Sequence, residues 1–393
     1  MVKYVRRGEN SPLRGEEIMF KKTVSVLLCI LLFVSCFSAA AGAFDVRPKL
    51  TYHVGENNEN TYVSFAYSDG TCYINDSAYG WTRDGYAFAG WAGEPDGKVV
   101  CFGGETVELT ENTDLYAVWC PVELEDNEIF FFNNSKRYFT GGEKGKYRMS
   151  AEHMAMLEKN IFKTFGPTPV PGIALGAVLA TYPEWNWQGS CYGISTVTAM
   201  QHYGMLDIKG LQNAETLYDM LNDEELISVI NYYQANAATS WLCENKAAKS
   251  VSSAYASSMK AMFESVKAGN IVMFTYYTGS AFITPGHTVL FTGAYETAGG
   301  EHVLVTYNCN RPSRYTNGIK NDRFILSADY KTMTDDNGAE IGDANWTDTF
   351  KQFEAFDIDG DTNTSSWYDT FFAHIKEIFN RLFAMIANIF AVK

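Results

Sequence analysis

The spacing of apolar residues predicts two kinds of structure, in a fixed order along the second half of the chain. Three segments repeat apolar residues at helical spacing, namely 191–203, 217–233 and 251–266. The pattern then changes to short β-branched and aromatic runs between Gly and Asn turns, at 270–277, 288–294, 302–307 and 323–327. Helices followed by an antiparallel sheet predict a domain of the α+β class.

The preceding segment, residues 46–119, is a series of short aromatic runs separated by turn residues. In one of them Tyr86 and Phe88 alternate with Ala87 and Ala89. Strict alternation between glycine turns predicts a half-buried strand, with one face on a core and the other in solvent. This part of the chain is therefore expected to be a small β module.

The N-terminal residues 1–43 have the pattern of a signal peptide with an upstream extension. Lys21 and Lys22 precede an apolar run at 23–34 that is too short to span a bilayer. A small-x-small cleavage site follows at 41–43. We expect the mature protein to be secreted or extracellular. A lipoprotein box ending at Cys36 is the alternative, weakened by its bulky first residue.

The C-terminal part contains two further segments. Residues 359–366 form a polar linker whose acidic spacing resembles a calcium loop, but the downstream glutamate of that loop is missing. Residues 367–393 place apolar and charged side chains on opposite sides of an amphipathic helix. Its charges argue against spanning, so we expect docking, self-association or an interfacial anchor at a membrane surface.

Charge and cysteine content narrow the environment. The formal net charge is −15, and it becomes −18 without residues 1–43, which hold six basic and three acidic residues. This acidity argues against nucleic acid as a partner and favours a soluble extracellular surface. Six cysteines lie outside the signal segment, too widely spaced for a small disulfide scaffold. Cys72 and Cys101 are candidates for a pair, which the sequence alone does not decide.

Two patterns in the β module carry a family resemblance. Gly-Tyr-x-Phe-x-Gly-Trp at 85–91 is followed by Leu-Thr-x-Asn-Thr-x-Leu-Tyr-Ala-x-Trp at 109–119. Residues 44–121 therefore resemble one internalin-type B repeat, also called the Listeria–Bacteroides repeat. The resemblance implies a β-grasp-like module of secreted and surface proteins. Such modules are spacers or adhesive units, with cell-wall or cell-surface association and no chemistry of their own.

The candidate chemistry lies at the boundary between the helical and the sheet segments. Cys191 follows Gly-Ser at the start of a predicted helix, and His287 opens a predicted strand after Pro-Gly. Asn308 ends the next strand, 21 residues after His287, and Asn310 shares its side of an extended chain. A thiol needs a base and the base needs an orienting partner. We predict Cys191 as nucleophile, His287 as base and Asn308 as the orienting amide, with Asn310 second.

These motifs resemble those of the papain-like cysteine peptidase superfamily. Gly-Ser-Cys-Tyr-Gly-Ile-Ser, Gly-His-Thr-Val-Leu and Tyr-Asn-x-Asn-x-Pro occur in the family's order, and the corresponding domain is 122–358. The resemblance implies peptide-bond hydrolysis of a peptide or protein substrate without a cofactor or metal. Two departures mark a divergent relative. The oxyanion glutamine expected six residues before the cysteine is Trp185, so Gln188 is the nearest candidate, and the 96-residue Cys-to-His spacing is short.

Two other functions fit the same pattern. The same thiol chemistry serves amidases that cut cell-wall peptides, and a catalytically inert adhesion protein would use the repeat alone. Metal and nucleotide sites are disfavoured because the chain has no Cys-x-x-Cys, His-Glu-x-x-His or phosphate-loop signature. A serine hydrolase elbow, Gly-x-Ser-x-Gly, is also missing.

Overall fold

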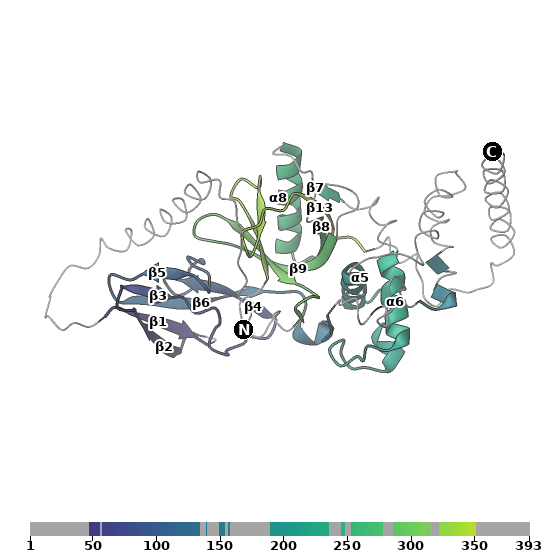
Figure 1. Ribbon diagram of the computed structural model, residues 1–393, viewed down its shortest axis with the longest axis horizontal. Helices are drawn as coiled ribbons and strands as arrows, with labels where there is room; N and C mark the ends of the chain where they lie inside the picture. Colours follow the sequence, from purple (N-terminus) through teal and green to yellow (C-terminus); the bar gives the residue numbers. More distant parts are fainter. Residues whose placement is uncertain are drawn as a thin grey trace, which may run out of the picture.

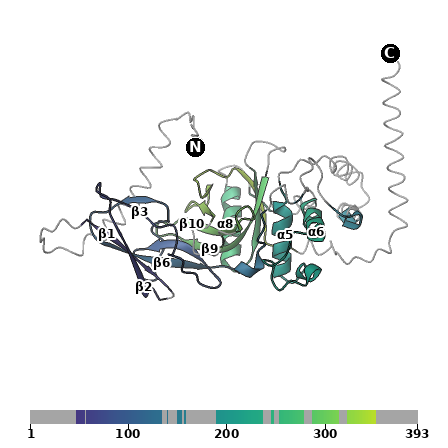
Figure 2. The same ribbon diagram turned by 60° about the horizontal axis from the view of Figure 1, so that its bottom comes forward.

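The protein is α+β, with two larger sheets and helices that follow the first of them. The structure is a computed structural model (Figures 1 and 2). It describes residues 47–55, 57–133, 139, 149–153, 156–157, 189–235, 245–247, 253–277, 286–312, 315 and 322–350.

A seven-stranded antiparallel sheet forms the centre of the molecule. Its order is β12-β11-β10-β9-β8-β13-β7. The strands are β7 (Asn245–Ala247), β8 (Val272–Tyr277), β9 (Gly286–Glu296), β10 (His302–Tyr307), β11 (Arg323–Leu326), β12 (Met333–Asp335) and β13 (Asp343–Thr347). The four strands predicted from the sequence are among them, so the change of period at residue 270 is confirmed as a change from helix to sheet.

Helices cover both faces of this sheet, and the strands are apolar on both sides for that reason. Along β8, Val272 and Phe274 belong to the core with α8 (Ser253–Lys267), whereas Met273 belongs to the core with α5 (Cys191–His202). The helix α6 (Glu224–Ala235) packs on the outer side of α5, as Figure 1 shows. Burying such side chains stabilises the fold by roughly 1.5–3 kcal/mol each.

One predicted helix begins later than its apolar spacing suggested. The pattern predicted a helix over 217–233, but α6 begins at Glu224 and residues 217–223 form turns. The backbone N–H of Leu226 donates to Asp223 Oδ1 at 2.9 Å, so Asp223 caps the helix at its N-terminus. A short 3-10 helix, η3 (Lys209–Gln212), precedes these turns.

The N-terminal module is a second, four-stranded sheet in the order β2-β1-β6-β4, with a parallel central pair β1–β6. Its strands are β1 (Lys49–Val54), β2 (Asn60–Phe65), β4 (Tyr86–Ala92) and β6 (Thr113–Pro121). A separate pair is formed by β3 (Thr71–Tyr73) and β5 (Thr106–Glu108). The core of the module contains Tyr52 and Trp91, whose ring centroids lie 4.7 Å apart.

The strand β4 is buried on both faces, so the expectation of a half-buried strand was wrong. Phe88 and Trp91 both belong to the core of the module, although strict alternation would place them on opposite faces, because the pairing of β4 with β6 shifts register between Phe88 and Gly90. Ala87 and Ala89, on the other face, belong to the core that contains α5. These small side chains allow a second layer to approach closely where the pattern suggested solvent.

The N-terminal module contacts the seven-stranded sheet at a junction between β4 and strand β9. The backbone N–H of Glu123 donates to Thr292 O at 2.8 Å, and Tyr295 Oη donates to Ala89 O at 2.8 Å. A Cβ added to Gly293 would lie 2.5 Å from Pro121 O, so only glycine fits here. The chain after β6 then continues through η1 (Asp126–Glu128).

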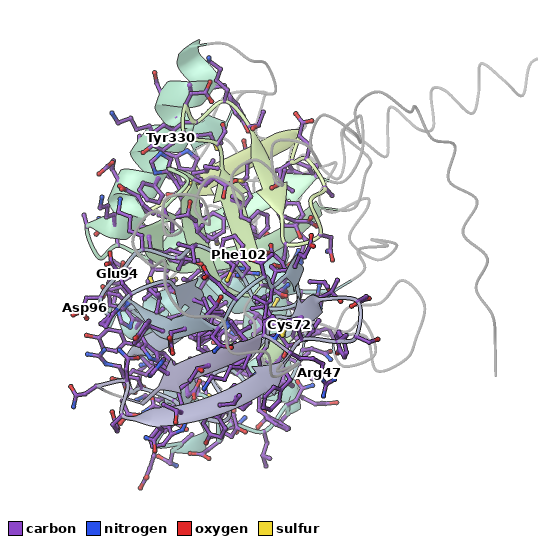
Figure 3. The ribbon with its side chains drawn as sticks, turned by 90° about the vertical axis from the view of Figure 1, so that its left-hand side faces the viewer. Arg47, Cys72, Glu94, Asp96, Phe102 and Tyr330 are labelled. Carbon is purple, nitrogen blue, oxygen red and sulfur yellow. The ribbon has the colours of Figure 1, made fainter. Side chains whose placement is uncertain are left out.

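Charged and aromatic side chains extend the junction. Glu296 accepts from Lys98 Nζ and from Lys267 Nζ, each at 3.0 Å, and thereby links the module to α8. The Arg323 guanidinium lies 4.0 Å from the centre of the Phe102 ring. Figure 3 shows Phe102 between the strands of the module and those of the seven-stranded sheet.

Several expectations concern other parts of the chain. The signal segment 1–43, the linker 359–366 and the amphipathic segment 367–393 lie outside the described residues. Cys72 and Cys101 are both free thiols, so the suggested pair is not formed. Within the described ranges, no helix has the length and apolar character needed to cross a membrane.

Candidate active site

Helix α5 begins at Cys191 and places this thiol against the sheet. The helix approaches α6 so closely that a Cβ on Gly193 would clash with the backbone carbonyl of Ile230. The backbone N–H of Gly193 donates to Gln234 Oε1 at 3.0 Å, and the buried Ser190 Oγ donates to Asn231 Oδ1 at 2.7 Å. The segment Gly-Ser-Cys-Tyr-Gly is therefore anchored on α6 on either side of Cys191, whose own exposed fraction is 8 %.

Strands β9 and β10 bring the histidine and the amide together. His287 is the second residue of β9, and Asn308 directly follows β10, which pairs with β9 in antiparallel register. The His287 Nε2–H donates to Asn308 Oδ1 at 2.8 Å. The hairpin predicted from the 21-residue spacing thus joins the two side chains that the sequence singled out.

The side chains of Cys191 and His287 are hydrogen-bonded, and each shifts the pKa of the other. Burial by itself raises the pKa of the Cys191 thiol, but the hydrogen bond and the charge of His287 outweigh it, so that this pKa is lowered. The backbone N–H groups of Thr288 and Tyr192 also favour the thiolate. Burial likewise lowers the pKa of His287, and its contacts with Cys191 and Asn308 raise it overall. Both shifts act toward the charged forms, a thiolate at Cys191 and an imidazolium at His287.

The contacts of Asn308 determine which imidazole nitrogen faces the thiol. Asn308 Oδ1 accepts from His287 Nε2–H and, at 3.0 Å, from the backbone N–H of Asn310. Since Nε2 carries its hydrogen toward Asn308, the other ring nitrogen, Nδ1, is left to exchange a proton with Cys191. The Asn310 amide lies 3.2 Å from Nε2, and a nitrogen that donates to Asn308 does not also accept from Asn310. Asn308 is thus the orienting partner in this geometry.

Two charged residues next to Asn308, namely Asp322 and Arg311, were not predicted from the sequence. Asn308 Nδ2 donates to Asp322 Oδ2 at 2.7 Å, and Arg311 Nη1 donates to Asp322 Oδ1 at 2.9 Å. Asp322 precedes β11, the strand beside β10, so it comes close to Asn308 through sheet pairing. No motif marks it, because an acidic residue before a strand is common in turns.

The remaining predicted site residue, Gln188, lies outside the described residues. Among the residues that the structure describes, no group of three His, Cys, Asp or Glu side chains is placed to hold a metal ion. A cavity of about 240 Å³ lies in the N-terminal module, lined among others by Arg83, Glu94 and Trp119 (Glu94 is labelled in Figure 3). It contains neither Cys191 nor His287, so it does not belong to the thiol site.

Searches of protein-family models, of curated proteins and of solved structures found no match to this chain.

Proposed function

We propose that this chain is a cysteine peptidase of the papain-like type, exported from the cell, that hydrolyses peptide bonds. The observation that carries the proposal is the hydrogen-bonded arrangement of Cys191, His287 and Asn308 at the start of a helix and the ends of two paired strands. A buried thiol with a lowered pKa beside an oriented imidazole is the requirement for nucleophilic catalysis.

In the proposed reaction, the Cys191 thiolate attacks the peptide carbonyl carbon and forms a C–S bond, while the carbonyl electron pair moves to oxygen. The His287 imidazolium gives its proton to the leaving amine as the C–N bond breaks, and an acyl thioester remains. The now neutral His287 takes a proton from water, whose oxygen attacks the thioester and releases the acid and the thiolate. Asn308 keeps the imidazole in the same orientation through both halves.

The oxyanion needs hydrogen-bond donors at the same place. The backbone N–H of Cys191, at the positive end of α5, is one proposed donor. The Gln188 side chain, three residues earlier, is the other.

The fold supports the proposal in a second way. A nucleophile at a helix N-terminus, packed on an antiparallel sheet that carries the base, is the arrangement that the resemblance implied. The parallel central pair β1–β6 of the N-terminal sheet agrees with the expected β-grasp-like repeat. We place the repeat at 44–121 and the peptidase domain at 122–358.

Cleavage of a peptide library by residues 44–393, read by mass spectrometry, tests the proposed function. We expect Cys191→Ala to reduce hydrolysis at least about a thousandfold, because the attacking atom is lost. Cys101→Ala, which removes a free thiol in the repeat, is the matched control and should retain activity.

Equal hydrolysis by the wild type and Cys191→Ala would contradict the proposal. A parallel digestion of cell-wall muropeptides separates the substrate classes. Thiol-dependent cleavage of muropeptides alone would replace the peptidase by an amidase.

A further inference from the structure

The side-chain amide of Asn308 has an oxygen end and a nitrogen end. Exchanging them would change which ring nitrogen of His287 carries the hydrogen. With Oδ1 toward His287, Nε2 carries a hydrogen and Nδ1 is available to the thiol. With the nitrogen end toward His287, Nε2 would have to accept, and the neutral imidazole would carry its hydrogen on Nδ1 instead. The orientation of this amide therefore determines whether His287 serves as a base.

Asp322 fixes the orientation of the Asn308 amide by contacting its nitrogen end. Its carboxylate accepts hydrogen bonds and donates none, so the group facing its Oδ2 at 2.7 Å has to be the amide nitrogen of Asn308. The second oxygen, Oδ1, accepts from Arg311 Nη1 at 2.9 Å, and the carboxylate side chain is only 10 % exposed. An uncharged amide offers a single acceptor oxygen and does not satisfy both donors.

We propose that Asp322 is a positioning residue of this site, which acts through Asn308 to hold the His287 imidazole in the orientation that activates Cys191. This inference rests on the proposed thiol site, and it adds a fourth and a fifth group, Asp322 and Arg311, to the relay of hydrogen bonds.

The negative charge of Asp322 supports the same role as its hydrogen bond to Asn308. The groups that face His287 are Cys191, Tyr276, Asn308, Asn310 and Asp322, and the negative charge of Asp322 favours the imidazolium. Losing this charge lowers the pKa of His287, and the weaker imidazolium raises the pKa of Cys191. Thiolate then forms at a higher pH and imidazolium disappears at a lower pH, so the active range narrows from both sides.

Alkylation of Cys191 by iodoacetamide measures this without any assumption about the substrate. The folded protein is labelled between pH 5 and pH 9, and the rate at Cys191 is followed by peptide mass spectrometry. For Asp322→Asn we expect the rising limb of the rate–pH profile to move to higher pH, so that the rate at the acid end of the range falls relative to the rate at pH 9. Asp336→Asn is the matched control, because Asp336 is also a little-exposed carboxylate paired with an arginine, Arg323.

A second arm separates positioning from general stability. In the Asn308→Ala background, Asp322→Asn should add a clearly smaller shift than it causes alone, because the part that acts through the Asn308 amide is gone and only the direct effect of the charge on His287 remains. Asp322→Ser, which removes the charge but leaves room for a water molecule, repeats the test if the Asn variant does not fold by circular dichroism.

The possible results are distinguishable. An unchanged alkylation profile in folded Asp322→Asn or Asp322→Ser, or a full extra shift in the Asn308→Ala background, overturns the role of Asp322 and leaves the peptidase proposal intact. The expected shift without any peptide hydrolysis supports Asp322 and overturns the peptidase proposal. A wild-type Cys191 that is alkylated like an ordinary thiol overturns both.

Discussion

The two edges of the N-terminal sheet differ sharply. At one edge, β2 exposes its side chains, including Val63 at 48 % and Phe65 at 54 %. At the other edge, six of the seven residues of β4 are buried, and Ala87 and Ala89 belong to the core that also contains Cys191. One half of the N-terminal module therefore shares a core with the seven-stranded sheet and α5, while the other half faces solvent.

Strand β9 connects this junction to the candidate site. His287 lies at the start of the strand, whereas Thr292, Gly293 and Tyr295 further along it contact the repeat. A sheet strand held by hydrogen bonds at one end transmits its position along its length. We therefore expect the N-terminal module to support the strand that carries His287, rather than to act only as a spacer.

The largest expected effect separates the two edges directly. Trp91 is fully buried and its Nε1–H donates to Asn75 O at 2.9 Å, so Trp91→Ala should cost about 3–5 kcal/mol. Phe65→Ala at the exposed edge should cost less than about 0.5 kcal/mol. Denaturant unfolding followed by circular dichroism gives both values.

The same experiment tests whether the two units unfold together. The buried Cys309 thiol reports on the core shared by α5 and the seven-stranded sheet. If the N-terminal module is an integral part of this unit, Trp91→Ala exposes Cys309 to thiol reagents at the same denaturant concentration at which the module unfolds. A protected Cys309 beside an unfolded repeat would show that the units are independent.

An intermediate effect tests the contact at β9. Gly293→Ala should cost roughly 1–3 kcal/mol, because the added Cβ would lie 2.5 Å from Pro121 O. Gly299→Ala is the control, since its Cβ would meet its nearest neighbour, Thr297 Oγ1, at 3.6 Å. Thermal unfolding compares the two variants, and equal midpoints would mean that the repeat does not pack tightly on β9.

The smallest effect concerns the charged bridge over the junction. The hydrogen bonds and charges of Lys267 and Lys98 lower the pKa of Glu296 to about 2, from 4.5. A lowered pKa gives stability that is present above pH 4.5 and is lost as the pH falls toward 2. Glu296→Gln should cost under about 1 kcal/mol at neutral pH and low salt, because the pair is at the surface.

The control for this prediction is Glu301→Gln, an exposed carboxylate on the following turn. Denaturant unfolding at low and high salt measures both variants. A loss in Glu296→Gln that persists unchanged in high salt would argue against an electrostatic bridge.

Local patterns predicted a large part of the molecule. The helix from Cys191, the end of α8 before Gly269 and the strand β10 follow from apolar spacing and glycine punctuation, and they are confirmed. The start of α6 was missed because the apolar residues at 217 and 220 fit a helical period, although Asp223 ends the preceding turns. Burial of Leu217 and Met220 explains the misleading pattern.

Helix starts, strand periods and hairpin spacing are local properties, so the order of the elements and the candidate residues Cys191, His287 and Asn308 could be predicted from the chain alone. Two further features arise only when the chain has folded. Pairing of β10 with β11 brings Asp322 next to Asn308, and packing against the core that contains α5 buries Ala87 and Ala89. Contacts of this kind join residues far apart in the chain, so no local pattern predicts them. The sequence pattern around a small apolar side chain such as alanine is also the same whether the side chain faces solvent or a second layer.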